Sequence, residues 1–302
     1  MLEHLNGSGE RPARVVVLGA AGFVGGAIVE RLARAGTNVL ALGRADVDLL
    51  AADASERLIR LFEPTDAVVA ASAAVPCVNP DMVVENMIIA RSIVSALAAY
   101  PVSHVINISS DAVYADSAEP LGEASCASPA SLHGAMHLAR EVMFRTAVSV
   151  PLATLRPTLL YGAGDTHNGY GPNRFMRSAK LGGPIALLGE GEERRDHVFI
   201  DDVAEIVRRV LDRRSRGVLN VATGVVSSFR ELAGRVAALA GGRGEGGVSI
   251  EMAPRSGPMP HNGYRPFNTD NCREAFPDFR YTSLDSGLAQ TWTTIRAVPG
   301  RG

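Results

Sequence analysis

The chain has 302 residues, of which 46% are apolar and 21% are charged, a balance typical of a globular protein with a sizeable core. The formal net charge of −2 gives no reason to expect a nucleic-acid partner. The three cysteines, Cys77, Cys126 and Cys272, have no metal-binding spacing, so we expect no metal and a reducing compartment.

No apolar run approaches the roughly 18–20 residues that a membrane-spanning helix needs, so we expect no membrane segment. The N-terminal segment, M-L-E-H-L-N-G-S-G-E-R-P, lacks the apolar core of a signal peptide and is expected to be a mobile arm. These features indicate a cytoplasmic protein.

Apolar runs alternate with helical periodicity in the first half of the chain. Residues 14–18 form an apolar run that ends at glycine, which predicts a strand buried on both faces. Val24, Ile28 and Leu32 share one face of a following helix. Further strands are predicted at 38–42, 67–70, 104–108 and 152–155, and further helices at 54–62, 81–100 and 131–147. This alternation predicts an α/β fold with a doubly wound parallel Rossmann sheet over residues 13–160.

Glycine and proline cluster after Pro157, which predicts long loops and short strands in a smaller C-terminal substrate lobe over residues 161–302. A segment at about 197–223 is expected to return to the Rossmann domain. In it, Asp202 and Glu205 resemble a capping pair at the start of a helix.

A glycine-rich turn joins the first predicted strand to the first helix. Gly19, Gly22 and Gly25 allow a tight turn, a close approach of the backbone to a pyrophosphate, and close packing of helix on strand. The helix N-terminus offers free N–H groups to the phosphates, and Phe23 and Val24 begin that helix. The sequence therefore predicts a dinucleotide cofactor here.

The G-x-x-G-x-x-G spacing resembles the short-chain dehydrogenase/reductase superfamily. Three further segments resemble motifs of its extended branch, the NAD-dependent epimerase/dehydratase family: I-S-S-D-A-V-Y (108–114), L-R-P-T-L-L-Y-G (155–162) and R-R-D-H-V-F-I-D-D-V-A (194–204). The resemblance covers roughly residues 14–295. It implies an NAD(P)-dependent enzyme that acts on a nucleotide-activated sugar.

The choice of cofactor depends on the end of the second strand. A carboxylate there favours NAD and a basic residue favours NADP. Arg44 stands at this point, so we expect NADP slightly ahead of NAD. By the resemblance, Asp48 and Leu49 contact the adenine, and Ala71 and Ala73 lie against the cofactor.

The family works through a Ser or Thr on the fourth strand and a Tyr-x-x-x-Lys pair. By position these are Ser110, His133 and His137, and the only lysine of the chain, Lys180, lies far away. The spacing puts both histidines on one helix face. Asp111 resembles the acid of the family's dehydratases, but Ala112 stands in place of the adjacent glutamate, which argues against dehydration.

Three interpretations of the histidine pair stay open. In the first, His133 is the acid/base and His137 orients the cofactor ribose or adjusts His133. In the second, other groups act, such as His167, Tyr170 or Asp111. In the third, the protein binds its ligands without turnover. Double protonation of the pair is disfavoured, so activity should fall at low pH.

The resemblance also implies the substrate contacts. Arg195 and Arg265 resemble arginines that bind the nucleotide diphosphate, and Asn173 resembles a phosphate contact. Loop position places His167, Asn168 and Tyr170 at the sugar.

Epimerisation through transient oxidation is the expected reaction. NADPH-dependent reduction of a keto-sugar and catalytically silent binding of cofactor and nucleotide-sugar are the alternatives. Helices 81–100 and 131–147 resemble a pair that forms a four-helix interface in the family, which predicts a homodimer.

Overall fold

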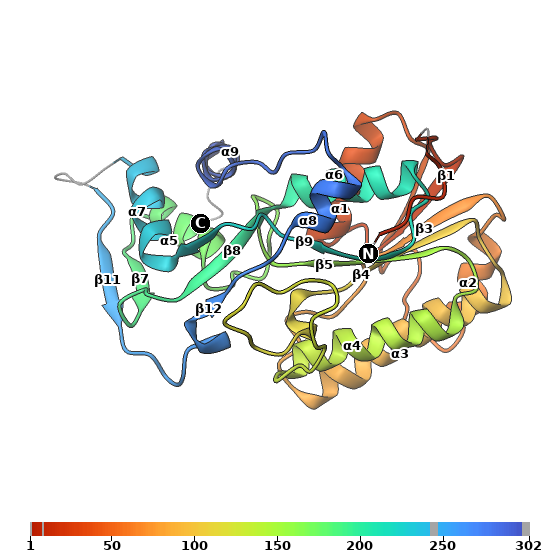
Figure 1. Ribbon diagram of the computed structural model, residues 1–302, viewed down its shortest axis with the longest axis horizontal. Coiled ribbons are helices and arrows are strands. Elements are labelled where there is room, and N and C mark those ends of the chain that lie inside the picture. The colour runs from red at the N-terminus through yellow and green to blue at the C-terminus, as the bar shows by residue number, and fades with distance from the viewer. Residues whose placement is uncertain (1, 8, 242–246, 298–302) are drawn as a thin grey trace.

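The computed structural model describes residues 2–7, 9–241 and 247–297 (Figure 1). Within these residues a sheet of six parallel strands has the order β2-β1-β3-β4-β5-β9. Its strands are β1 (Arg14–Leu18), β2 (Val39–Leu42), β3 (Asp66–Ala70), β4 (His104–Ile108), β5 (Leu152–Pro157) and β9 (Gly217–Val221). The predicted Rossmann sheet is confirmed, and the strands expected in the first half of the chain lie within two residues of their predicted bounds.

Helices cover both faces of this sheet. Helices α1 (Phe23–Arg34) and α6 (Ile200–Asp212) pack on one face, and α2 (Ala54–Leu61), α3 (Pro80–Ala99) and α4 (Leu132–Ala147) pack on the other. Strand β1 shows why: Val15 and Val17 belong to the first core, and Val16 and Leu18 to the second. A strand buried on both faces needs such an unbroken apolar run.

The strand order reverses beside β1, since β2 lies on one side of it and β3 on the other. Ligands of open α/β sheets bind in the crevice at such a switch point, at the carboxyl ends of the strands. The glycine-rich turn follows β1 at this end.

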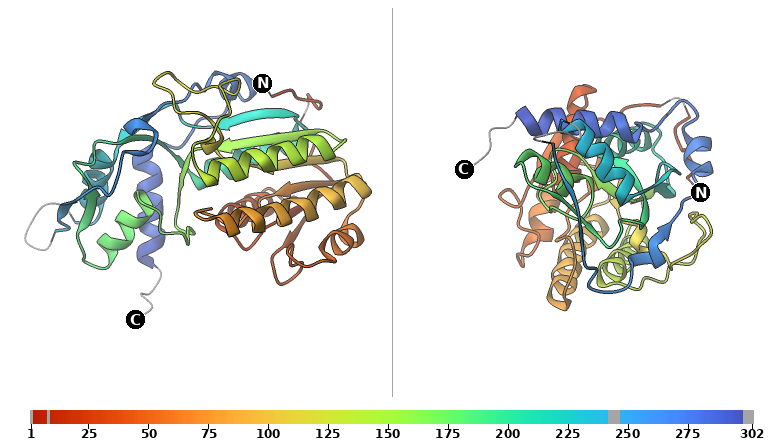
Figure 2. Two further views of the ribbon diagram at one scale, coloured as in Figure 1. Left: turned by 90° about the horizontal axis from the view of Figure 1, so that it is seen from below. Right: turned by 90° about the vertical axis from the view of Figure 1, so that its left-hand side faces the viewer.

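A smaller lobe holds a separate mixed sheet around β8 (Arg194–Phe199). Its other strands are β6 (Leu159–Tyr161), β10 (Val226–Ser228) and β12 (Tyr264–Arg265), and β7 (Ile185–Leu188) pairs with β11 (Ile250–Ala253). Helices α5 (Pro172–Lys180), α7 (Phe229–Leu239) and α9 (Leu284–Ala297) pack around Phe175, Phe229 and Trp292, whereas α8 (Asp270–Ala275) packs on the Rossmann domain. Figure 2 shows this lobe beside one end of the large sheet.

The expected mobile N-terminal arm was wrong for the residues next to the start. Leu2 is buried, and Glu3 forms an antiparallel bridge with Arg216. The ring of His4 bonds through Nδ1 to Ser215 Oγ at 2.7 Å and through Nε2 to the carbonyl of Ala275 at 2.9 Å. A polar composition concealed these contacts, because they are made to residues distant in the sequence.

The predicted capping pair was also wrong. Helix α6 already begins at Ile200, so Asp202 lies inside its first turn. The Asp202 carboxylate accepts hydrogen bonds from the backbone N–H and the hydroxyl of Thr282, both at 2.8 Å. Glu205 pairs instead with arginines, among them Arg31 of α1. These carboxylates join elements and do not cap the helix.

The statement that no segment is long and apolar enough to span a membrane was wrong for α3. Its 20 residues reach a mean hydropathy of 1.5 over the most apolar window, so the helix passes a test of length and composition. In the structure Ile89, Ile93 and Leu97 are buried in the core that α3 shares with the sheet. The helix is therefore part of the packed Rossmann domain.

Acidification is expected to destabilise the fold through His104. This side chain is buried, its Nε2 donates to the carbonyl of Ser215 at 2.7 Å, and burial lowers its pKa to about 4. The unfolded chain takes up the proton first, so stability is lost as pH falls from 6.5 to about 4. The loss from this group is on the order of 3 kcal/mol. Urea unfolding at several pH values should show a weaker pH dependence in His104→Gln, and an unchanged dependence would contradict this origin.

Candidate active site

A cavity of about 360 Å³ opens at the carboxyl ends of β1, β2 and β3. It gathers residues predicted to hold the cofactor from three separate segments of the chain. These are Gly19, Gly22, Arg44, Asp48, Leu49, Ala71 and Ala73. The side chain of Arg44 is 73% exposed and pairs with Asp48 at 3.6 Å, so its guanidinium stands at the rim of this cavity.

The glycine-rich turn has the shape that a pyrophosphate requires. Gly19 has a φ of +85°, which favours glycine, and a Cβ on Gly25 would lie 2.1 Å from the carbonyl oxygen of Gly19. No side chain caps the N-terminus of α1, which leaves its backbone N–H groups to a ligand. These residues fit the phosphates of a dinucleotide cofactor.

A second cavity, of about 350 Å³, shares Gly22, Ala71 and Ala73 with the first. It runs from the start of α1 to the loop before α5, and it brings Phe23, Val24 and Gly25 together with His167, Tyr170 and Asn173. The two cavities therefore form one continuous groove, here named the ligand groove, that joins the Rossmann domain to the lobe. Asn168 is exposed, with a φ of +52°, and does not line either cavity.

Two of the residues predicted to bind substrate already have internal partners. The hydroxyl of Tyr170 accepts a hydrogen bond from the Leu188 N–H at 2.9 Å. The amide of Asn173 accepts from the Gly162 N–H at 3.0 Å and donates to Asp165 at 2.8 Å. As substrate contacts, both residues stay predictions.

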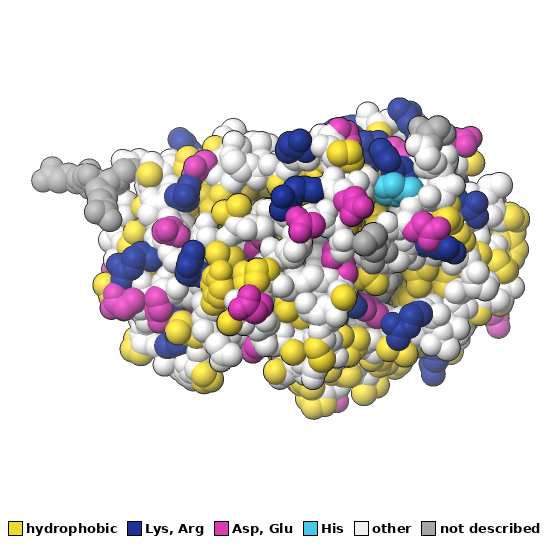
Figure 3. All heavy atoms as spheres, viewed as in Figure 1, with side chains coloured by type: hydrophobic (Ala, Val, Ile, Leu, Met, Phe, Trp, Pro, Cys, Tyr) yellow, Lys and Arg dark blue, Asp and Glu magenta, His cyan; other side chains and the backbone are white. Residues whose placement is uncertain are grey.

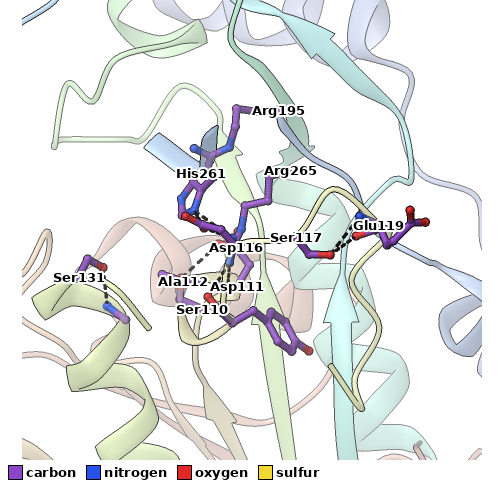
Figure 4. Close-up of polar contacts among 12 residues, drawn as sticks. Ser110, Asp111, Ala112, Asp116, Ser117, Glu119, Ser131, Arg195, His261 and Arg265 are labelled. Atoms are coloured by element: carbon purple, nitrogen blue, oxygen red, sulfur yellow. Dashed lines mark hydrogen bonds and ion pairs between the residues drawn. The ribbon is translucent and has the colours of Figure 1, made fainter. Parts of the chain in front are cut away.

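The start of α4 is fixed against the turn that carries Ser110. The Ser131 hydroxyl caps the helix by accepting from the Gly134 N–H at 3.1 Å. A Cβ on Gly134 would lie 2.0 Å from the carbonyl oxygen of Ala112, so only glycine allows this contact. Ser110 in turn caps the short helix η1 (Asp111–Val113) by accepting from the Ala112 N–H at 3.2 Å. Figure 4 shows these two caps.

The two histidine rings meet edge to face, with centroids 4.7 Å apart. His133 Nδ1 accepts a long hydrogen bond, 3.4 Å, from the N–H of Cys77. Residues 71–75 line the ligand groove and lead to Cys77, so the same segment links the groove to His133. His133 thus contacts the segment that leads out of the groove wall, and neither histidine lines the two cavities themselves.

Burial keeps both histidines neutral at physiological pH. It lowers the pKa of His133 below 6.5, although nearby Asp111 acts in the opposite direction. The pKa of His137 falls well below 6.5, first through burial and then through the charges of His133 and Arg140. An unprotonated imidazole at this place is able to accept a proton or donate one from a ring N–H.

Asp111 is held in a cluster of charged side chains (Figure 4). Arg265, which is 1% exposed, donates from Nε to Asp111 Oδ2 at 2.8 Å and from Nη1 to Asp116 at 3.1 Å. His261 Nδ1 lies 2.5 Å from the same Asp116 oxygen. Arg195 points toward His261 and pairs with Glu193 at 3.3 Å. Asp111 and Arg265 therefore neutralise one another.

Sequence reasoning missed several residues of this region. His261 and Asp116 complete the cluster around Arg265, and only the motif around Arg265 hinted at them. A buried network behind Ser110 was missed as well: the Ser109 hydroxyl donates to Glu141 at 2.5 Å, and Arg156 binds the same carboxylate at 2.6 and 2.9 Å. Arg140, fully buried on α4, was not singled out either.

The chain is similar to known proteins in both sequence and fold. The model of the family described as NAD dependent epimerase/dehydratase family matches residues 15–222. The UDP-glucose 4-epimerase of Mycolicibacterium smegmatis is 30% identical, over 92% of this chain and 97% of the relative. The solved UDP-glucose 4-epimerase of Thermus thermophilus, a complex with NAD, has a TM-score of 0.80 at 24% identity and covers 95% of this chain and 100% of its own. A GDP-L-fucose synthetase of Naegleria fowleri bound to NADP has a TM-score of 0.81 at 17% identity, over 94% of each chain.

Proposed function

Since this chain belongs to the NAD dependent epimerase/dehydratase family, we propose that it is an NAD(P)-dependent epimerase of a nucleotide-activated sugar. The observation that carries the proposal is the ligand groove, which runs from the glycine-rich turn to the lobe, with His133 in contact with the segment that leads out of its wall. UDP-glucose is the first substrate to test, because the near full-length relative from M. smegmatis is a UDP-glucose 4-epimerase.

Different residues of the chain bind the cofactor and transfer the proton. Gly19, Gly22 and Gly25 hold the phosphates of the cofactor, whose nicotinamide supplies the acceptor and donor of a hydride. His133 takes the proton from the sugar hydroxyl as it is oxidised and returns it after reduction. Ser110 hydrogen-bonds the same sugar oxygen.

A keto-sugar reductase is the second candidate, and one contact favours it. Because His133 Nδ1 accepts the N–H of Cys77, the neutral ring carries its proton on Nε2. An Nε2–H group is ready to protonate the oxygen of a ketone during reduction. A base in epimerisation needs the other tautomer, which gives up this 3.4 Å contact. Because the contact is long, losing it to change the tautomer costs little free energy.

The decisive assay incubates the purified protein with UDP-glucose, with and without added NAD or NADP, and follows the sugar by NMR. We expect the C4 epimer to appear and no net change in the cofactor. Consumption of NADPH with a nucleotide 4-keto-sugar, without epimerisation, would establish the reductase instead. Nucleotide-sugar binding without either conversion would establish a silent binding protein.

Arg44 is proposed to favour NADP by pairing with its 2′-phosphate. We expect Arg44→Ala to weaken NADP binding on the order of 10- to 100-fold, as for a lost charge-assisted hydrogen bond, and to leave NAD binding nearly unchanged. Isothermal titration of both cofactors measures this. Arg60→Ala, an exposed arginine outside the groove, is the matched control. An equal loss for NAD and NADP would overturn the assignment.

The chain is further proposed to form a homodimer through α3 and α4. Figure 3 shows hydrophobic side chains gathered along the lower edge of the molecule, over these helices. Val84 of α3 is 59% exposed and Val142 of α4 is 42% exposed. Light scattering should give twice the chain mass of 31.8 kDa, and Val84→Glu should shift the mass toward one chain. A single-chain mass for the unmodified protein would contradict the dimer.

A further inference from the structure

Arg140 carries a positive charge in the core that no carboxylate neutralises. It is 1% exposed, and its guanidinium donates to Asn107 Oδ1 at 2.7 Å, to the Ser72 carbonyl at 2.6 Å and to the Ala70 carbonyl at 2.9 Å. It also lies over the Phe144 ring, 5.1 Å from the centroid. Among the described residues, no ion pair is formed by Arg140.

The other buried arginines of this region are different. Arg156 pairs with Glu141 and Arg265 pairs with Asp111, both through short contacts. Burying a charge that lacks a partner of opposite sign is costly, and an apolar side chain of similar size avoids that cost. Burial lowers the pKa of Arg140 only to about 10, so the group stays charged at neutral pH.

Arg140 ties the helix that carries the histidine pair to the wall of the ligand groove. The Ser72 carbonyl that it binds belongs to the groove wall, and His137 is three residues earlier on α4, on the same side of the helix. Two buried atoms beside it lack hydrogen-bond partners: Nδ2 of Asn107 and Nδ1 of His137. The carbonyls satisfy the buried guanidinium and tie it to the groove wall.

We propose that Arg140 is a positioning residue that supplies a fixed positive charge behind the groove wall and sets the end of β3 against the cofactor. The inference deepens the proposed function, on which its catalytic meaning rests. A neutral His137 leaves any proton of the pair to His133, the partly exposed member. The hydrogen bonds from Arg140 to the carbonyls of Ala70 and Ser72 keep the groove wall in place.

The other groups near His137 do not replace this charge. His133 lies on the same helix, Asp111 of η1 faces His133, and the Cys77 thiol follows β3. On the remaining side Glu141 is already neutralised by Arg156 of β5. Arg140 is thus the only permanent cation among the charges named as acting on His137.

The test compares Arg140→Gln, which removes the charge and keeps hydrogen-bonding groups, with Arg140→Lys, which keeps the charge. The readouts are the NMR titration of the His137 ring in the ligand-free protein and the Kd for NAD and NADP. In Arg140→Gln we expect cofactor binding to weaken about tenfold and the pKa of His137, which burial lowers most, to rise. Arg140→Lys should stay near the unmodified protein in both measurements.

His104, whose burial keeps its pKa at about 4, is the internal control and should titrate alike in all variants. If Arg140→Gln does not fold, the double variant Arg140→Met with Asn107→Leu removes both polar partners and answers the same question. Unchanged Kd values for NAD and NADP in a folded, uncharged variant would overturn the proposal. Because this readout needs neither substrate nor turnover, its outcome is separate from that of the epimerase assay.

Discussion

Replacing His133 by alanine is expected to lower kcat by about 10²- to 10⁴-fold, the usual contribution of a general acid or base. The cofactor should still bind, because the glycine-rich turn and the groove wall do not depend on this ring. We assign this role to His133 and not to His137 because its ring is partly exposed, whereas that of His137 is buried and without a partner at Nδ1. Initial rates and cofactor titration on the same preparation separate the two effects.

Leu132→Ala is the matched control, since Leu132 is the exposed neighbour of His133 at the start of α4. It tests whether disturbance of the helix end alone lowers the rate. In the unmodified protein kcat/KM should decline only below pH 6.5, because the lowered pKa of His133 keeps the base unprotonated above that value. A His133→Ala rate within threefold of the control, by a rough criterion, would move the proton transfer to another group.

Arg156→Met is expected to lower the free energy of unfolding by about 3–5 kcal/mol, as when one partner of a buried ion pair is removed. Arg156 binds both oxygens of Glu141 and donates to the Tyr114 hydroxyl at 2.8 Å. Glu141 is 4% exposed, so the substitution would leave a buried carboxylate with only the Ser109 hydroxyl. Urea unfolding of the purified variant measures the loss.

Two further variants define the origin of that loss. Arg156→Met combined with Glu141→Leu removes both charges and should recover much of the stability. Arg34→Met breaks an exposed pair with Glu30 on α1 and should cost no more than about 1 kcal/mol. Equal losses for Arg156→Met and Arg34→Met would show that the buried pair stabilises the fold no more than the exposed pair does.

Most of the Rossmann sheet could be predicted because its signals are local. The run that became β1 is apolar at every position that the sheet buries, and the helix that became α1 repeats its apolar residues at helical spacing. Helix α6 shows the limit of such reasoning. Asp202 and Glu205 have the spacing of a cap, yet their partners are Thr282 and arginines on two helices, which no local pattern reveals.

The groove residues were predictable for the same reason, since glycine spacing and strand ends are local features. The cluster around Asp111 was not, because His261 and Arg265 approach it from about 150 positions away in the sequence. Arg140 could not be predicted for a different reason. It occupies a helix position that faces the core, where a charged residue is not expected, and the carbonyls of Ala70 and Ser72 with the Asn107 side chain explain how it fits there.

The docked N-terminal arm has a consequence for biosynthesis. His4 binds Ser215 and Ala275, which are 211 and 271 positions further along the chain. On the ribosome these partners emerge long after His4, so the arm can dock only when most of the chain has been made. We therefore expect the arm to dock late, onto a Rossmann domain that has already folded.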